Sequence, residues 1–502
     1  MTESPHEHGL LSLPAELLQQ IFSYLEPLDL AYAAQTCRQL CTASYDEQLW
    51  QHLVNRNLPY PTSAPTPLNT FRELYVRHHP HWFLARQAIW FADSEPSGKL
   101  LVASYDPQRG RIEAHAVVAR RGLHSIEFWE KDREVVIHGF NPTISLDRNQ
   151  SVLKLEVDSP RTEDQPKYRA GHKPLSRYGK EVLMETFAEA GLYSSFMLCR
   201  KLPDAAITEQ TRLWPTLRLP ATSRTRNDTR DGYSSSGHRP TRLDEVSEDT
   251  FRLRKWVEYT GRRSSPNAMS FTSPNGLSAA LGRSGPYFAS TFSSTEGGGM
   301  SIRMPEDITT YSTLPKSAYT PTKEKPWQGI WCGDYSGHGY EFLVVVQPDK
   351  QDEVPLPEAM TWLRDWFRGG RRRGSDGSTS SYASAQEDAD DAATELLQSL
   401  DEQDPTTDAH VPPQTPAGIR EVLPHSDVPD APTGRLEAIK LTGDPNIPRG
   451  EYTFIAPDIG PGGLLRVADE EIFKGARVVR SAGHIAERGF RDGMTSYCIA
   501  AT

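Results

Sequence analysis

Two short stretches combine glycine with side chains that could bind a ligand. One is the Gly-His-Gly sequence at 337–339, and the other is the Thr-Gly-Asp-Pro sequence at 442–445. Glycine allows tight turns and close approach of the backbone to a ligand, and His338 could donate a hydrogen bond to a carboxylate or an amide. Both stretches are also ordinary turn sequences, in which His338 is simply exposed and Asp444 stabilises a turn. For His338, Asp444 and Thr442 alike, both interpretations stay open: a ligand contact or a residue of an ordinary turn.

Three aromatic residues precede the Gly-His-Gly sequence. Trp327, Trp331 and Tyr335 could form an aromatic wall for the end of a bound peptide. Aromatic residues at alternate strand positions also serve as ordinary core residues. The following residues are the candidates for binding a protein substrate: Trp331, Tyr335, His338, Thr442 and Asp444.

No catalytic constellation accompanies these candidates. The sequence has no nucleophile elbow, Walker loop or His-Glu-x-x-His motif. Cys37 and Cys41 lie four residues apart, but no second pair is suitably spaced for a metal. We therefore expect a protein that is not an enzyme and that has no metal and no cofactor.

The elements that would position these residues begin with helices near the N-terminus. Leu17, Leu18, Ile21, Phe22 and Leu25 fall on one broad face of a helix. The following features bound the three expected helices: Pro14 in the first turn, Pro27 as the end of the first helix, Asp29 to about Cys41 as the second, and Ser44 with Glu47 as a capping box that opens the third.

Three such short helices leave apolar surface uncovered. A unit of fewer than ~50 residues is marginally stable alone, because it buries too little of its surface. The uncovered apolar surface therefore predicts a protein-docking module. The alternative is the N-terminal corner of a larger helical core, and the spacing alone leaves that alternative open.

Residue identities in this stretch are similar to the F-box motif. Leu13-Pro14, Ile21-Phe22, Cys37-Arg38 and Leu49-Trp50 match it almost position for position. The resemblance implies binding to the adaptor Skp1, and through Skp1 to the cullin and RING subunits of a ubiquitin ligase. In the family, the residues at these positions contact Skp1: Leu13, Pro14, Leu17, Ile21, Phe22, Leu25, Leu30, Cys37 and Arg38.

A connector follows the F-box residues 9–57. Residues 58–81 begin with a Pro/Thr-rich stretch, and Thr70 with Glu73 predicts a capping box for a helix. His78, His79 and His81 stand at the end of that helix, where we expect them to act as cations.

Residues 82–502 read as a β-rich domain interrupted by insertions. We expect the following elements: strands at 99–105, 111–118, 133–138, 151–157 and 192–199, short helices at 181–191 and 249–259, strand pairs at 329–347 and 436–454, and a strand in 473–489. Stretches rich in Ser, Thr, Pro, Gly or charge are expected to be disordered, at about 158–180, 215–250, 260–322 and 369–432. The fold class is therefore α+β, with a three-helix F-box followed by an antiparallel β-barrel-like domain.

The strand pairs resemble the substrate domain of the F-box-only-protein thirty-one family. The matching residues are Gly329 to Glu341, Lys440 to Pro448, and the segment from Gly483 to Phe490. The resemblance implies a ubiquitin-ligase receptor that recognises C-terminal segments of its targets. After Phe490 the family supplies further strands that this sequence lacks, so we expect an open edge or a different closure of the barrel.

The composition limits the cellular compartments in which the protein could act and the classes of partner it could bind. A net charge of −11 argues against a uniformly basic nucleic-acid binder, and no apolar run is long enough to span a membrane. Five cysteines and the lack of a signal peptide indicate the cytoplasm, the nucleus or both. The predicted function is the substrate-recognition subunit of a Skp1–cullin–F-box ligase. The alternative is a β-barrel that binds a small ligand and uses the F-box only for assembly with Skp1.

Overall fold

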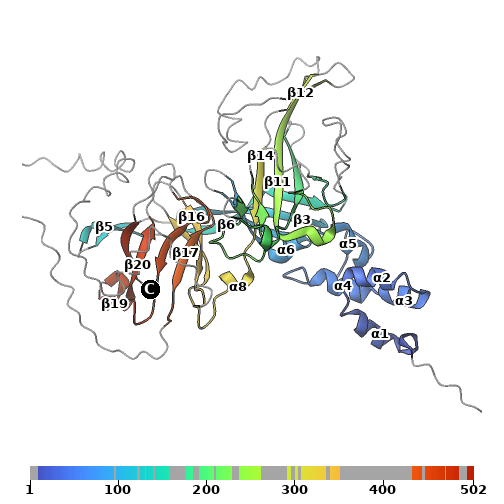
Figure 1. Ribbon diagram of the computed structural model, residues 1–502, viewed down its shortest axis with the longest axis horizontal. Helices are drawn as coiled ribbons and strands as arrows, with labels where there is room; N and C mark the ends of the chain where they lie inside the picture. The colour runs from blue at the N-terminus through green and yellow to red at the C-terminus, as the bar shows by residue number, and fades with distance from the viewer. Residues whose placement is uncertain are drawn as a thin grey trace, which may run out of the picture.

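The chain consists of N-terminal helices followed by two antiparallel sheets. In Figure 1 the helices lie at the right, the first sheet in the middle and the second sheet at the left. This computed structural model describes residues 9–94, 98–120, 125–129, 132–139, 142–157, 176–184, 192–208, 211–228, 237–261, 291–294, 300–303, 307–334, 340–350, 432–443, 447–469, 471–484 and 495–501.

Residues 9–57, all of which are described, form a compact helical unit. Its elements are the 3-10 turn η1 Leu10–Ser12 and the helices α1 Ala15–Phe22, α2 Pro27–Ala33, α3 Arg38–Ser44 and α4 Glu47–Asn55. The expected second helix is thus wrong, because it is divided in two. Cys37 has extended backbone angles, which end one helix and begin the next.

Two other expectations about helix ends are also wrong. Pro27 does not end the first helix, which stops at Phe22; Pro27 is the first residue of α2, where a missing N–H costs nothing. Asp46, and not Ser44, caps α4, because its carboxylate accepts a hydrogen bond from the N–H of Gln48 at 2.8 Å. The Ser44 hydroxyl instead donates to the carbonyl of Cys41.

Two helices connect this unit to the first sheet: α5 Phe71–His78 and α6 Phe83–Gln87. The Thr70 hydroxyl accepts a hydrogen bond from the N–H of Glu73 at 3.1 Å, which confirms the predicted N-terminal cap. Phe71 and Leu74 are buried, so α5 packs into the same core as the preceding helices.

The first sheet contains ten strands of the described chain. They are β1 Ile89–Asp93, β2 Leu100–Asp106, β3 Arg111–Arg120, β6 Thr143–Glu156, β7 Val182–Met184, β8 Leu192–Arg200, β11 Val246–Gly261, β12 Thr291–Ser294, β13 Met300–Arg303 and β14 Asp307–Ser312. Their order is β12-β13-β11-β14-β1-β2-β3-β6, and β8 pairs with β11 and with β7. Two pairs stand apart: β4 Ser125–Trp129 with β5 Asp132–Gly139, and β9 Leu213–Trp214 with β10 Thr225–Arg226. The five strands expected between residues 99 and 199 are confirmed.

The helix expected at 249–259 is wrong, because this segment is the middle of β11. Phe251 and Leu253 enter the core on one face, while the intervening Arg252 is buried on the other. This alternation has the period of a strand. The helix expected at 181–191 is also wrong where it is described, since residues 182–184 form β7.

Much of the sequence expected to be disordered is ordered. Trp214, Leu219 and Arg239 are buried within the expected disordered range 215–250 or beside it. In the range 260–322, residues 307–312 form β14, and the helix α8 covers Lys316–Tyr319. The expectation of disorder was wrong because polar side chains such as Thr225 and Thr310 are buried in the core, although their type suggests exposure. The expected insertion at 369–432 and most of that at 158–180 lie outside the described residues.

The second sheet confirms the strand pairs expected near residues 329–347 and 436–454. Its strands are β15 Gly329–Asp334, β16 Tyr340–Val346, β17 Leu436–Lys440, β18 Tyr452–Ala456, β19 Leu464–Val467, β20 Arg477–His484 and β21 Thr495–Ala501. The order is β15-β16-β17-β18-β20-β19, and β21 also pairs with β20. The 3-10 turns of the described chain include η3 Asp204–Ala206, η5 Leu243–Glu245 and η8 Glu471–Phe473.

The two sheets form half-barrels rather than the single barrel that we expected. Between them lies a cluster to which both contribute: Phe91 from β1, Trp214 from β9, and Phe342, Ile439 and Tyr452 from the second sheet. A second cluster joins the N-terminal helices to the first sheet without interruption. Helices and sheets are therefore packed onto one another. No helix in the described part of the chain is long and apolar enough to cross a membrane.

Candidate protein-binding surfaces

The helices of residues 10–45 carry large apolar side chains that remain exposed. We call them the exposed apolar set: Leu10, Leu11, Leu17, Ile21, Tyr24, Leu28, Tyr32 and Tyr45. Leu17 is 45% exposed, Ile21 39% and Tyr24 80%. A single exposed leucine needs no explanation, but eight large apolar side chains within 36 residues indicate a surface that a partner covers.

The opposite side of the same helices packs into the chain. Leu18, Phe22 and Leu30 are buried, and the last two belong to the cluster that contains Leu49 and Trp50 of α4. The amphipathic helices therefore use one side to fold and leave the other side exposed.

The structure places the predicted Skp1-binding residues at different depths. Those that are exposed are Pro14, Leu17, Ile21 and Arg38, those that are half-buried are Leu13, Leu25 and Cys37, and those that are buried are Phe22 and Leu30. Phe22 and Leu30 are thus core residues of this chain. Tyr24 and Tyr32 are strongly exposed and were missed; Tyr32 lies four residues after Leu28 on α2, a helical spacing that could have indicated it, while Tyr24 lies in the turn before α2.

Polar contacts fix these helices to the connector. The Glu47 carboxylate accepts a hydrogen bond from the N–H of Phe71 at 2.9 Å, so the start of α4 is tied to the start of α5. The indole N–H of buried Trp50 donates to the carbonyl of Ser44 at 2.8 Å. The guanidinium of Arg72 lies 4.1 Å from the centre of the Tyr45 ring, as in a cation–π contact.

The connector is fixed to the first sheet in turn. Nε2 of His78 lies 3.0 Å from the carbonyl oxygen of Gly110 in the turn between β2 and β3. The His78 ring also packs edge-on against Trp82 and Tyr105. Burial lowers the pKa of His78 to about 4, so the expected helix-end cation is wrong at this position.

The candidates for binding a protein substrate are only partly described. Trp331 lies on β15 and is 46% exposed, and its indole N–H donates to the carbonyl of Trp327 at 3.1 Å. In the strand register Trp331 pairs with Leu343, which pairs with Lys440, so the three share one face of the sheet. On that face, Lys440 is fully buried and forms an ion pair with Glu341 at 2.6 Å.

Thr442 is engaged within the fold. Its hydroxyl accepts a hydrogen bond from the N–H of Phe342 at 2.8 Å, which joins the end of β17 to β16. Tyr335, His338 and Asp444 lie outside the described residues, so whether the five candidates meet stays a prediction.

Asp93 and Arg449 were missed by the sequence analysis. The guanidinium of Arg449 donates twice to the Asp93 carboxylate, from Nε at 3.1 Å and from an η nitrogen at 2.7 Å. Gly98 has a positive φ of 78°, and a Cβ there would lie 2.6 Å from the Arg449 side chain. The contact fixes the loop between β17 and β18 against the first sheet, and no local signal could reveal it because the residues are 356 positions apart.

Comparison with known proteins matches two parts of the chain to family models. Residues 10–56 match the family model of F-box-like domains. Residues 311–497 match the model described as the cyclin D1 binding domain. A search of curated proteins gave no match. The helices that carry the exposed apolar set therefore form an F-box-like domain, and the second match runs from the end of β14 through the second sheet into β21.

Proposed function

We propose that this F-box protein is the substrate-recognition subunit of a Skp1–cullin–F-box ubiquitin ligase. The observation that carries the proposal is the exposed apolar set on helices that match the F-box-like model. Apolar surface of this extent favours a partner, since each square ångström removed from water contributes roughly 25 cal/mol. The partner that this domain implies is Skp1, which would connect the chain to cullin and RING subunits.

Binding to Skp1 can be tested by reversing the polarity of two exposed residues. We expect Leu17→Asp with Ile21→Asp to abolish capture of Skp1, because the two carboxylates would have to be buried without partners. Both side chains are exposed, so the fold and the thermal unfolding midpoint should change little. Co-purification of Skp1 with the full chain measures the effect.

A matched control is Leu217→Asp with Val467→Asp, which changes two exposed apolar residues far from the helices in sequence. This control should capture Skp1 as the unchanged chain does. Equal capture of Skp1 by the Leu17/Ile21 variant would remove the basis of the proposal.

We infer that the second sheet binds the protein to be ubiquitinated. The support is the match of residues 311–497 to the cyclin D1 binding model, together with the sequence resemblance to the F-box-only-protein thirty-one family. We therefore propose cyclin D1, or a protein like it, as the class of target, bound through a C-terminal segment. Exposed Trp331 is the described candidate for contact with the target.

The target can be tested with immobilised full-length chain and cyclin D1. Trp331→Ala should weaken binding of cyclin D1 by about 1–3 kcal/mol if the indole is an anchor of the interface, because exposed aromatic anchors carry much of the binding energy. Tyr60→Ala, at another exposed aromatic residue, is the control. Failure of the unchanged chain to bind cyclin D1, or its C-terminal segment, would refute this target and leave the Skp1 proposal intact.

In this role the chain contributes proximity and not covalent chemistry. A receptor that holds its target at a fixed position raises the effective concentration of target at the transferring enzyme. The connection from α4 through α5 to the first sheet, made by Glu47 and His78, supports such a fixed position. We propose the cytoplasm, the nucleus or both as the site of action.

A further inference from the structure

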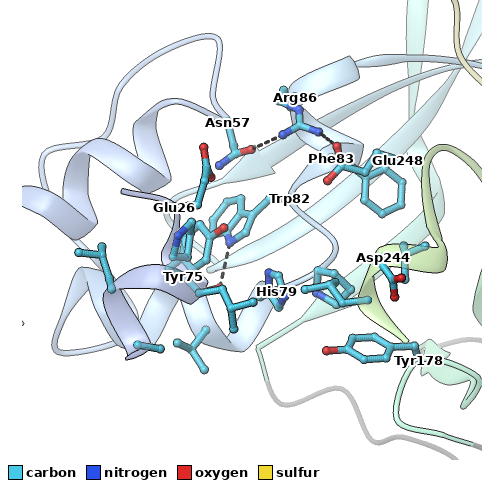
Figure 2. Close-up of a pocket in the computed structure, with 18 of the residues that line it drawn as sticks. Glu26, Asn57, Tyr75, His79, Trp82, Phe83, Arg86, Tyr178, Asp244 and Glu248 are labelled. Carbon is cyan, nitrogen blue, oxygen red and sulfur yellow. Dashed lines mark hydrogen bonds and ion pairs between the residues drawn. The ribbon is translucent and has the colours of Figure 1, made fainter. Parts of the chain in front are cut away.

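A cavity lies where the F-box-like helices, the connector and the first sheet meet. Its volume is about 810 Å³, and its lining comes from α2, from α5 and α6, and from loops near residues 177, 201, 222 and 245 (Figure 2). This volume falls in the range of roughly 300–1,000 Å³ that is typical of small-molecule sites. The sequence suggested, as an alternative, a small ligand inside a single β-barrel; the space between the two sheets is filled by Phe91, Trp214 and Phe342.

One wall of the cavity is aromatic. Tyr75 stands between Trp50 and Trp82, with ring centres 5.6 Å and 6.2 Å away, and it stacks on His79 at 5.9 Å. Figure 2 shows Tyr178 on the opposite side, from the loop that follows residue 176. A flat apolar body could lie against such rings with favourable stacking.

The carboxylates of the lining are already compensated. Glu26 pairs with Arg56, Asp244 with Arg242, and Glu248 with Arg86. The fourth, Asp249, accepts hydrogen bonds from Ser223 and Gln87, and burial raises its pKa. They therefore offer little attraction to a cationic ligand.

The lining contains as many cations as carboxylates, four of each: Arg72, Arg86, Arg177 and Lys201 against Glu26, Asp244, Glu248 and Asp249. Arg177 and Lys201 line the cavity and are exposed, and the ion pairs among the described residues include neither of them. Arg72 contacts the Tyr45 and Trp50 rings rather than a carboxylate. Since Arg56 and Arg242 pair with two of these carboxylates from outside the lining, Arg177 and Lys201 remain available to an anionic group.

We propose that this cavity is a binding site for a small organic anion with a flat apolar body. The apolar body packs against Tyr75 and Tyr178, and Arg177 and Lys201 bind the anionic group. Such a ligand contacts both the F-box-like helices and the first sheet. It would therefore stabilise the orientation of the Skp1-binding surface relative to the rest of the chain.

The test uses 2-naphthoate as the probe and 2-naphthamide as its uncharged isostere, titrated into the full chain by calorimetry. Naphthoate should bind saturably at one site, and naphthamide about tenfold more weakly or worse, because one charge-assisted hydrogen bond is worth that much. The variant Arg177→Glu with Lys201→Glu should lose naphthoate binding to a similar or larger extent. Both residues are exposed, and Skp1 capture and the unfolding midpoint should stay unchanged.

A matched variant, Lys316→Glu with Lys323→Glu, makes the same charge reversals at exposed residues outside the cavity and should bind naphthoate as before. Three results would overturn the proposal: no saturable binding of naphthoate, equal affinity for naphthamide, or full binding by the Arg177/Lys201 variant. Because Skp1 capture is measured separately, failure here leaves the proposed ligase function untouched.

Discussion

His78 shows how a single side chain joins two parts of the molecule. Its ring nitrogen contacts the carbonyl of Gly110, and its ring packs between Trp82 and Tyr105, so α5 cannot move without disturbing the turn between β2 and β3. Burial keeps this imidazole neutral, since the pKa is lowered from 6.5 to about 4. Protonation of His78 is thus coupled to folding.

We expect the stability of the chain to fall as the pH is lowered from 6.5 towards 4. In this window the unfolded state binds a proton at His78 and the folded state does not, so stability is complete above pH 6.5 and is lost below it. The loss is about 1.4 kcal/mol per pH unit for this residue. Denaturant unfolding at several pH values, comparing His78→Gln with the unchanged chain, isolates the contribution.

The variant should show the shallower dependence on pH, and the difference between the two curves should grow as the pH falls. His52→Gln, at an exposed position on α4, is the control and should leave the slope unchanged. Identical slopes for His78→Gln and the unchanged chain would mean that His78 is not buried as described.

At the scale of elements, the spacing of apolar residues correctly predicted the helices and strands that are stabilised by contacts close in sequence. The N-terminal helices and most strands have clear periods of apolar residues, and Thr70 caps α5 as its type and spacing indicated. The prediction was wrong for segments that are stabilised by residues distant in the sequence. In β11, Arg252 donates to Thr310, to His238 and to Arg226, and these partners lie in stretches whose composition suggested disorder.

For the candidate binding surfaces too, the outcome depends on whether a side chain's surroundings are close to it or distant from it in the sequence. Helical spacing placed Leu17, Ile21 and Phe22 on one broad face, but the structure leaves Leu17 and Ile21 exposed and buries Phe22. Thr442 was a candidate for ligand contact or for a turn, and the structure shows its hydroxyl accepting a hydrogen bond from the backbone N–H of Phe342, 100 residues away. A pairing at such separation depends on the register of β16 and β17, which sequence alone does not specify.

The loop between β17 and β18 provides a test at this scale. Arg449→Ala should remove two charge-assisted hydrogen bonds to Asp93 and destabilise the junction by about 1.5–3 kcal/mol. Amide hydrogen exchange should therefore become faster in residues 441–443 and 447–451. Lys474→Ala, at an exposed position, should leave exchange in the loop unchanged. Unchanged exchange in the Arg449 variant would show that the loop does not depend on Asp93.

At the scale of the whole molecule, one continuous core runs from Phe22 through Trp50, Leu74 and Trp90 to Phe251. The second sheet joins this body through the cluster around Phe91 and Phe342. The helices that carry the exposed apolar set and the second sheet thus lie at opposite ends of one packed structure, as Figure 1 shows. This arrangement suits a receptor that binds its adaptor at one end and its target at the other.

Hydrogen exchange of the full chain with and without Skp1 tests this arrangement most directly. Protection on adding Skp1 should be concentrated in residues 10–45, which carry the exposed apolar set, and should leave the second sheet, residues 329–350 and 432–484, unchanged where it is described. Protection centred on the second sheet, or no protection in residues 10–45, would contradict the account.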